Sequence, residues 1–232
     1  NVLNQVRNNE LNTSGYEILL EQYNPDFQNP KKDSYITLTT HNYKADTINN
    51  EELAKLKGPL FTYKADISED FSEKMYPADE KLQLKMGSQV MFIKNDADKA
   101  KRFFNGKIGT IESIDDEKIM VLCKGDDEAI EVKKNKWENI RYSLNKQSQK
   151  LEEDVIGSFT QYPLRLAWAI TIHKSQGLTF EKAIIDAGKA FAPGQVYVAL
   201  SRCTSLSGMV LLSKISTNSL SVDQRIIKYI SE

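Results

Sequence analysis

Residues 169–180 read AITIHKSQGLTF, and the interpretation of the chain starts from this stretch. It passes directly from an apolar run into a cluster of hydroxyl, imidazole, ammonium and amide groups. The apolar spacing over residues 164–175 predicts a helix that ends in the polar cluster. Downstream, the pattern predicts strands at residues 183–186 and 209–212 and helices at residues 194–203 and 222–230. Strands that alternate with helices indicate a parallel sheet, so the predicted fold class is α/β.

A second polar cluster follows the stretch YITLTT at residues 35–40. The β-branched and aromatic residues of this stretch predict a short buried strand. A helix is expected over residues 45–57, with Gly58 at its C-terminal cap. Residues 1–23 have helical spacing, and residues 24–33, which include two prolines, are expected to form an irregular linker.

The middle of the chain has a different pattern, in which short segments of alternating apolar and polar residues are separated by turn residues. Five short strands within about sixty residues are typical of a small antiparallel barrel. The sequence therefore predicts a parallel-sheet domain that is interrupted by an inserted barrel. The predicted strands of the barrel are residues 89–94, 108–114, 119–123, 129–132 and 140–144.

Composition excludes several classes of protein. The 232 residues carry 31 basic and 32 acidic side chains, so bulk charge cannot attract nucleic acid or anionic lipid. Residues 155–215 nevertheless hold six basic and two acidic side chains, a local net charge of +4. No apolar run approaches the roughly 20 residues needed to cross a bilayer, so no membrane association is expected.

The two cysteines, Cys123 and Cys203, have no disulfide or metal-ligand spacing. We therefore expect no metal site and a reducing, cytoplasmic location. Because the chain begins with Asn1 rather than Met and opens in the middle of a helical pattern, we expect a fragment of a longer protein.

The polar clusters have two interpretations. At the carboxyl edge of a parallel sheet, such donors are positioned to bind phosphate oxygens. Alternatively, His41 and Asn42 cap the following helix, while His173 and Lys174 contact helix C-terminal carbonyls. Both interpretations can hold together.

Arg202 stands at the end of the predicted helix at residues 194–203, whose interior is apolar. A guanidinium group in this position pairs either with a carboxylate of the same chain or with a phosphate of a ligand. Composition does not decide between these two partners.

Three segments, LTTHN at residues 38–42, AITIHKSQGLTF at residues 169–180 and VYVALSR at residues 196–202, resemble the C-terminal motifs of superfamily 1B DNA helicases of the Pif and RecD type. The stretch LKMGSQVM at residues 84–91, which precedes Asn105-Gly106, also agrees with this group. The resemblance covers roughly residues 35–212. A set of motifs in this order is far more specific than a single glycine motif.

The resemblance implies a motor of two RecA-like domains, of the P-loop NTPase type, with ATP between them. This chain would supply the second domain as residues 35–83 and 145–232, with the barrel inserted at residues 84–144. Residues 1–34 would be the tail of the first motor domain or a hinge. The sequence contains no GxxxxGK[ST] motif, so the phosphate loop and the Mg²⁺ ligands are expected in an N-terminal motor domain in cis.

The resemblance also implies site residues. Arg202 matches the catalytic arginine that reaches the γ-phosphate of ATP, and Gln176 and Gly177 match the nucleotide side of the same site. The expected partner is single-stranded DNA, with translocation from 5′ to 3′. ATP and Mg²⁺ are expected cofactors of the complete enzyme, with neither bound by this fragment alone. The matched DNA-binding residues are Thr39, Thr40, His41, Asn42, Thr171, His173 and Lys174.

A different class of function remains open, in which the chain is a stand-alone nucleic-acid-binding or regulatory module without ATPase activity. A phosphate loop within about 250 residues upstream, one motor domain's length, would favour the helicase. An independent nucleotide hydrolase is disfavoured, because the sequence has no phosphate loop.

Overall fold

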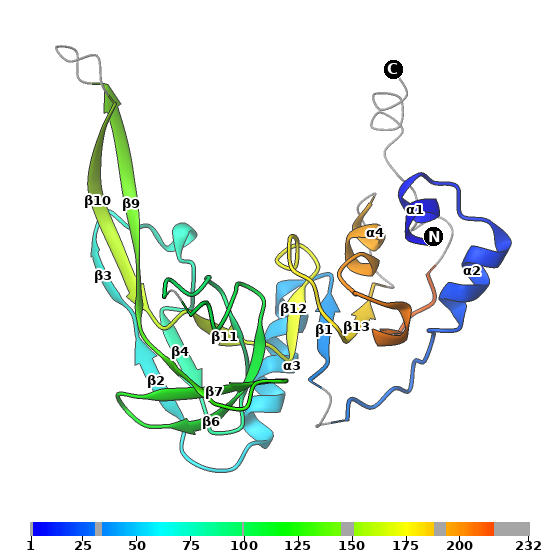
Figure 1. The fold of residues 1–232 in the computed structure, drawn as a ribbon, viewed down its shortest axis with the longest axis horizontal. Coiled ribbons are helices and arrows are strands. Elements are labelled where there is room, and N and C mark those ends of the chain that lie inside the picture. The colour runs from blue at the N-terminus through cyan, green and yellow to red at the C-terminus, as the bar shows by residue number, and fades with distance from the viewer. Residues whose placement is uncertain (1, 31–33, 99, 145–150, 188–193, 216–232) are drawn as a thin grey trace. The chain divides into compact units, whose positions relative to one another are not determined.

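A computed structural model describes residues 2–30, 34–98, 100–144, 151–187 and 194–215 of the chain (Figure 1). The chain divides into two compact units, one of residues Asn1–Glu52 and Ala167–Glu232, the other of residues Leu53–Leu166. Residues 84 and 144, the expected boundaries of the insertion, both lie inside the second unit. Every helix in the described part of the chain is too short or too polar to span a lipid bilayer.

The first unit is built on a parallel sheet with the strand order β12-β1-β13-β14. Strand β1 is buried along its whole length, as are β12 and β14. Continuous apolar strands of this kind are typical of parallel sheets, which are covered on both faces. The strands are β1 (Ile36–Thr39), β12 (Ala169–Thr171), β13 (Ala183–Asp186) and β14 (Met209–Leu211).

The described helices of the first unit lie before and between these strands. In α2, the Asn12 side chain caps the N-terminus by accepting a hydrogen bond from the Gly15 amide at 2.8 Å. The chain then passes along the sheet, where the Asn24 amide donates to the Leu211 carbonyl at 2.9 Å. The predicted helix at residues 222–230 lies outside the described residues. The helices are α1 (Val2–Arg7), α2 (Thr13–Leu20), α3 (Asn42–Lys55), α4 (Gln195–Leu200) and the 3₁₀ turn η2 (Leu206–Gly208).

The helix predicted at residues 164–175 is wrong. This stretch forms β11 (Leu164–Leu166), then β12, then a turn. Strand β11 pairs antiparallel with β5 (Gln89–Phe92), and β12 pairs parallel with β1. A short apolar run has no periodicity that separates a buried strand from a buried helix, so pairing with distant strands decided its structure.

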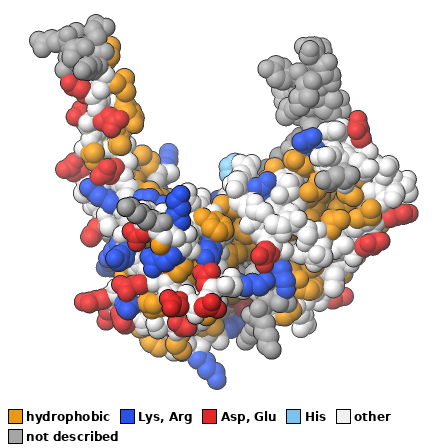
Figure 2. Space-filling view, in the orientation of Figure 1, with side chains coloured by type: hydrophobic (Ala, Val, Ile, Leu, Met, Phe, Trp, Pro, Cys, Tyr) orange, Lys and Arg blue, Asp and Glu red, His pale blue; other side chains and the backbone are white. Residues whose placement is uncertain are grey.

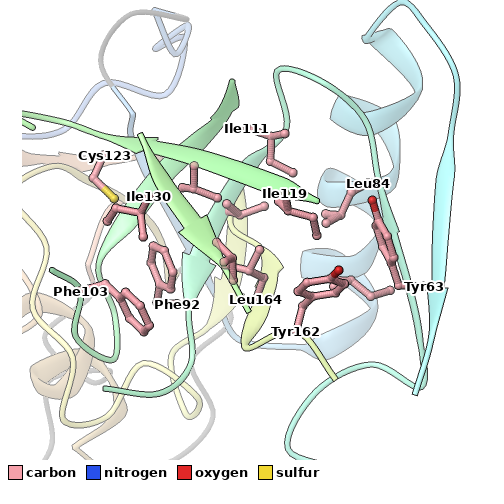
Figure 3. Close-up of a cluster of buried hydrophobic side chains, with 14 residues drawn as sticks. Tyr63, Leu84, Phe92, Phe103, Ile111, Ile119, Cys123, Ile130, Tyr162 and Leu164 are labelled. Carbon is pink, nitrogen blue, oxygen red and sulfur yellow. The ribbon is translucent and has the colours of Figure 1, made fainter. Parts of the chain in front are cut away.

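In the second unit, a five-stranded antiparallel sheet has the order β11-β5-β6-β7-β8. Its buried side chains form one cluster with those of the antiparallel pair β2 and β4, and within this cluster Phe92 and Phe103 stack at 4.1 Å between ring centroids (Figure 3). Within the described residues, no pairing joins β8 to β11, so the sheet is open and the predicted barrel is not confirmed. The remaining strands are β2 (Phe61–Lys64), β4 (Lys81–Leu84), β6 (Ile108–Ile114), β7 (Ile119–Cys123) and β8 (Ile130–Val132).

A second sheet of this unit has the order β3-β10-β9. Strand β9 (Asn135–Leu144) is longer than predicted, and β10 (Leu151–Gln161) was not predicted. Strand β3 (Asp66–Glu69) pairs only with residues 157–160 of β10, so β9 and β10 continue as a two-stranded ribbon (Figure 1). Exposed apolar side chains, including Tyr142 and Leu151, line this ribbon (Figure 2). A 3₁₀ turn, η1 (Glu73–Met75), follows β3.

Candidate functional site

The two polar clusters leave the sheet of the first unit at the same edge. Thr39 ends β1 and lies opposite Thr171, which ends β12. Both threonines are buried, with 0% and 5% of their surface exposed. The Ile172 amide donates a hydrogen bond to the Thr39 carbonyl at 2.8 Å, so the chain segments after the two strands remain adjacent. The parallel pairing therefore brings the two predicted clusters together.

The loop after β1 is held by its own hydroxyl groups. Thr39 Oγ1 donates to the His41 carbonyl at 3.1 Å, and Thr40 Oγ1 lies 2.7 Å from His41 Nδ1. The His41 carbonyl accepts from the Ala45 amide at 3.4 Å, so His41 takes the N-cap position of α3 through its backbone. Asn42, the first residue of α3, is exposed. The capping interpretation thus holds for the backbone of His41 while the Asn42 side chain faces solvent.

An ion pair at this edge was missed by the sequence interpretation. Lys44 Nζ lies 2.8 Å from Asp186 Oδ2, and Asp186 ends β13 opposite Thr39. The hydrogen bond that Lys44 donates to Asp186 raises the pKa of Lys44 above its usual value. The pair ties the first turn of α3 to the sheet. A carboxylate at the end of a predicted strand, on the same edge as the other clusters, was the signal that could have identified Asp186.

The turn after β12 directs its hydroxyl groups inward and its other polar groups outward. Thr171 Oγ1 accepts from the Lys174 amide at 3.3 Å, and Ser175 Oγ donates to the Ile172 carbonyl at 2.7 Å. Ser175 is fully buried. Because this turn follows a strand, the alternative in which His173 and Lys174 contact helix C-terminal carbonyls is wrong. The exposed residues of the turn are His173, Lys174, Gln176 and Gly177.

Gly177 has a backbone φ of +79° and open space around its Cα. Residues other than glycine rarely adopt this left-handed conformation. The glycine therefore allows the turn to reverse direction directly after Gln176.

Arg202 is half-buried just beyond the end of α4, against the same turn. Its Nη1 donates to the Leu178 carbonyl at 2.9 Å, its Nε to the Val198 carbonyl at 3.0 Å and its Nη2 to Ser201 Oγ at 2.9 Å. The Leu178 contact places the guanidinium beside the segment that carries Gln176 and Gly177. No hydrogen bond joins this side chain to residues 39–42, whose cluster follows a different strand.

Every hydrogen-bond acceptor of Arg202 is a neutral oxygen. Among the described residues, no carboxylate lies within ion-pair distance of its guanidinium group. Of the two partners that the sequence left open for Arg202, the internal carboxylate is thus not found in the described part of the chain. A half-buried guanidinium whose hydrogen bonds all go to neutral oxygens, with no internal counter-ion in the described part of the chain, suits an external anion. Nor does the described chain gather three His, Cys, Asp or Glu side chains in a metal-binding arrangement.

Sequence comparison and structure comparison with known proteins find relatives of the same name. No protein-family model matches the chain. The ATP-dependent DNA helicase Pif1 of Campylobacter jejuni is 34% identical over 218 residues, which cover 85% of this chain and 48% of the relative. The solved structure of unliganded Pif1 from a Bacteroides species has a TM-score of 0.90 and 35% identity, covering 99% of this chain and 52% of that one. The structure of Bacteroides Pif1 bound to single-stranded DNA gives a TM-score of 0.74 at the same identity and coverage.

The class of protein follows from the α/β fold, from the motifs at the edge of its parallel sheet and from these relatives. This class is superfamily 1B of the DNA helicases. Within that class, the chain belongs to the Pif1-type family. It spans about half the length of the relatives it matches.

Proposed function

We propose that this chain is the C-terminal motor half of an ATP-dependent DNA helicase that moves from 5′ to 3′ along single-stranded DNA. In this proposal, residues 35–83 and 145–232 form the second RecA-like domain, with residues 84–144 inserted in it. Residues 1–34 form the tail of the first motor domain or a hinge. The direction of movement rests on the resemblance to superfamily 1B. The Campylobacter relative is named as an ATP-dependent DNA helicase, which supports the reaction type.

The observation that carries the proposal is a single turn that carries one exposed cation, Lys174, and is contacted by a second cation, Arg202, from beyond the end of α4. Lys174 projects from the exposed part of the turn, and its side chain forms no hydrogen bond or ion pair with another described residue. Arg202 holds the other end of the same turn through the Leu178 carbonyl. A change in the contacts of Arg202 would move a segment only four residues from Lys174. Such a turn can couple an anion on one side to an anion on the other.

On the nucleotide side, Arg202 would act as an arginine finger. Its planar and permanently charged group fits the charge that develops on the oxygens of a transferred phosphoryl group. Gln176 and Gly177 would face the nucleotide beside it. The phosphate loop and the ligands of Mg²⁺ would come from the N-terminal motor domain, so this chain alone should bind ATP poorly.

On the DNA side, the exposed groups at the edge of the sheet would contact the backbone of single-stranded DNA. Phosphate contacts carry no base information, which suits an enzyme that moves along any sequence. The Bacteroides relative in the comparison was solved with single-stranded DNA bound. The exposed or half-buried residues assigned to this side are Thr40, His41, Asn42, His173 and Lys174. Thr39 and Thr171, which the resemblance also assigns to DNA, are buried and would hold the two loops in place rather than contact the DNA.

The test compares Arg202→Ala and Lys174→Ala in the complete enzyme, with ATP turnover and single-stranded DNA affinity measured on both variants. Arg202→Ala should lower turnover about 10³-fold or more with nearly unchanged DNA affinity, as expected for an arginine finger. Arg202→Lys should recover little, because an ammonium group lacks the bidentate fork. Lys174→Ala should weaken DNA binding and reduce the salt slope by about 0.7, the value for one phosphate contact on single strands.

Three results would contradict parts of this proposal. If Arg202→Ala only destabilises the fold, with turnover per folded molecule unchanged, the arginine caps the end of α4 and has no catalytic role. If Lys174→Ala abolishes turnover while the DNA affinity and its salt slope stay constant, the two sides of the turn are assigned in reverse. Turnover by the isolated chain that disappears in Arg202→Ala would show that no N-terminal domain is needed for hydrolysis.

A further inference from the structure

Tyr43 is an exposed aromatic side chain that none of the preceding assignments uses. It is 63% exposed. The other large hydrophobic side chain that is exposed in the described part of the first unit, Leu20, reaches only 37%. Burial of a tyrosine ring is favourable, so a ring left in water beside a functional edge marks a contact surface.

The backbone of Tyr43 is fixed although its ring is exposed. Its carbonyl accepts a hydrogen bond from Thr47 Oγ1 at 2.8 Å within the first turns of α3. The next residue, Lys44, is tied to Asp186 at the end of β13. The helix therefore cannot shift away from the sheet edge without breaking this ion pair. A ring presented from a fixed backbone loses little conformational entropy when a ligand covers it.

Among the described residues, the ring has one aromatic neighbour, His41. Its centroid lies 5.5 Å from that of His41, and the two planes are tilted by 48°. His41 follows Thr39 and Thr40 in the loop already assigned to the DNA backbone. Tyr43 therefore lies at the same sheet edge as the proposed phosphate contacts, with a flat apolar surface beside a ring that can donate hydrogen bonds.

We propose that Tyr43, supported by His41, stacks on a base of single-stranded DNA bound at this edge of the sheet. This inference rests on the proposed function and adds to it a contact with the base. Every base has a flat π-face, so stacking on an aromatic ring tolerates any sequence, as phosphate contacts do. The ring would hold one nucleotide in place while neighbouring donors bind the backbone.

The experiment separates base contacts from backbone contacts. The 232-residue chain and its variants are titrated with fluorescently labelled oligo-dT and with an abasic oligomer of equal length, over a range of salt concentrations. Tyr43→Ala should weaken binding of oligo-dT by roughly 5- to 150-fold, the range for loss of one base–aromatic stack. It should change binding of the abasic oligomer less than about twofold and leave the salt slope constant. Tyr43→Phe, which keeps the ring, should bind like the original chain.

Two control variants accompany it. Tyr142→Ala removes a tyrosine of similar exposure, 58%, from the β9–β10 ribbon and should leave oligo-dT binding unchanged. Lys174→Ala should weaken the binding of both oligomers and lower the salt slope, as the proposed function requires. This variant therefore tests the DNA side independently of Tyr43.

Equal weakening of both oligomers by Tyr43→Ala would overturn the stacking proposal, because the loss would then come from the backbone or from the fold. An equal loss with Tyr142→Ala would also overturn it. If the original chain binds neither oligomer, or if Lys174→Ala leaves the salt slope unchanged, the assignment of the DNA side itself fails. Normal binding of oligo-dT by Tyr43→Ala would contradict the stacking contact alone.

Discussion

At the scale of single residues, the turn of residues 175–178 depends on one backbone conformation. Gln176 precedes Gly177, and the Leu178 carbonyl holds Arg202. The left-handed φ of Gly177 lets Gln176 and Leu178, on either side of it, face different directions. The conformation of one glycine thus affects both proposed halves of the site.

Replacement of Gly177 tests this dependence. Gly177→Ala should lower the free energy of unfolding by about 1–2 kcal/mol, the cost of left-handed backbone for an L-residue, since no atom lies within 4 Å of the added Cβ. Gly177→Asn should cost less, because asparagine tolerates this conformation. Urea denaturation measures both variants.

Gly125→Ala is the matched control, because Gly125 also has a positive φ, +86°, and open space around it. It should cost a similar free energy of unfolding and leave ATP turnover of the complete enzyme unchanged, whereas Gly177→Ala should reduce turnover. Equal turnover in the two variants would mean that the turn has no role in the reaction.

At the scale of elements, the β9–β10 ribbon has two parts of different stability. Near its base, Phe159 is fully buried and packs against Tyr76 with 4.9 Å between ring centroids. Farther out, the side chains of Tyr142, Leu144 and Leu151 are each more than half exposed. An isolated two-stranded ribbon is at best marginally stable in water. The base should therefore determine the stability of the ribbon.

Shortening the ribbon tests this division. Ile140 and Val155 are cross-strand partners, so an Asn-Gly turn can replace residues 141–154 without a change of register. The free energy of unfolding of this variant should stay within about 0.5 kcal/mol of the original, as for other surface changes. Phe159→Ala should lower it by about 3–5 kcal/mol. A large loss on shortening, measured in urea, would show that the outer ribbon supports the fold.

At the scale of the whole molecule, several buried groups titrate at high pH. Burial raises the pKa of Cys123 to about 11 and that of Cys203 to about 11. Burial also raises the pKa of Tyr63, whose hydroxyl donates to the Asp115 carbonyl. In each case, the folded protein favours the protonated, neutral group. Cys203 lies in the first unit and Cys123 in the second, so the stability of both units should depend on pH in the alkaline range.

The stability of the protein should fall as the pH rises from about 8.5 to 11. In the unfolded chain, a cysteine loses its proton near pH 8.5, whereas in the folded chain these thiols keep theirs until about pH 11. Between these values the unfolded state binds fewer protons, so the free energy of unfolding decreases with pH. Urea midpoints at pH 8 and pH 10 measure the decrease. The double variant Cys123→Ala and Cys203→Ala should show a smaller decrease, and an equal slope in both proteins would contradict the cysteine contribution.

The sequence by itself determined which polar side chains make up the candidate site, and it determined several elements. Strand β1, strand β13 and the apolar helix α4 follow from local composition, because each is a short run with a clear pattern and clear ends. The polar groups after β1 and β12 were identified from residue type alone. The family also followed from the sequence, since its motifs are local strings in a fixed order.

Only the tertiary structure decided the rest. Residues 164–166 and 169–171 form strands because they pair with β5 and β1. These partners are far away in the sequence, and no local pattern encodes such pairing. Asp186 became the partner of Lys44 for the same reason. The contact of Arg202 with the Leu178 carbonyl joins residues that are 24 positions apart in the sequence. Hydrogen bonds and ion pairs between distant segments depend on register and close packing, which exist only once the chain has folded.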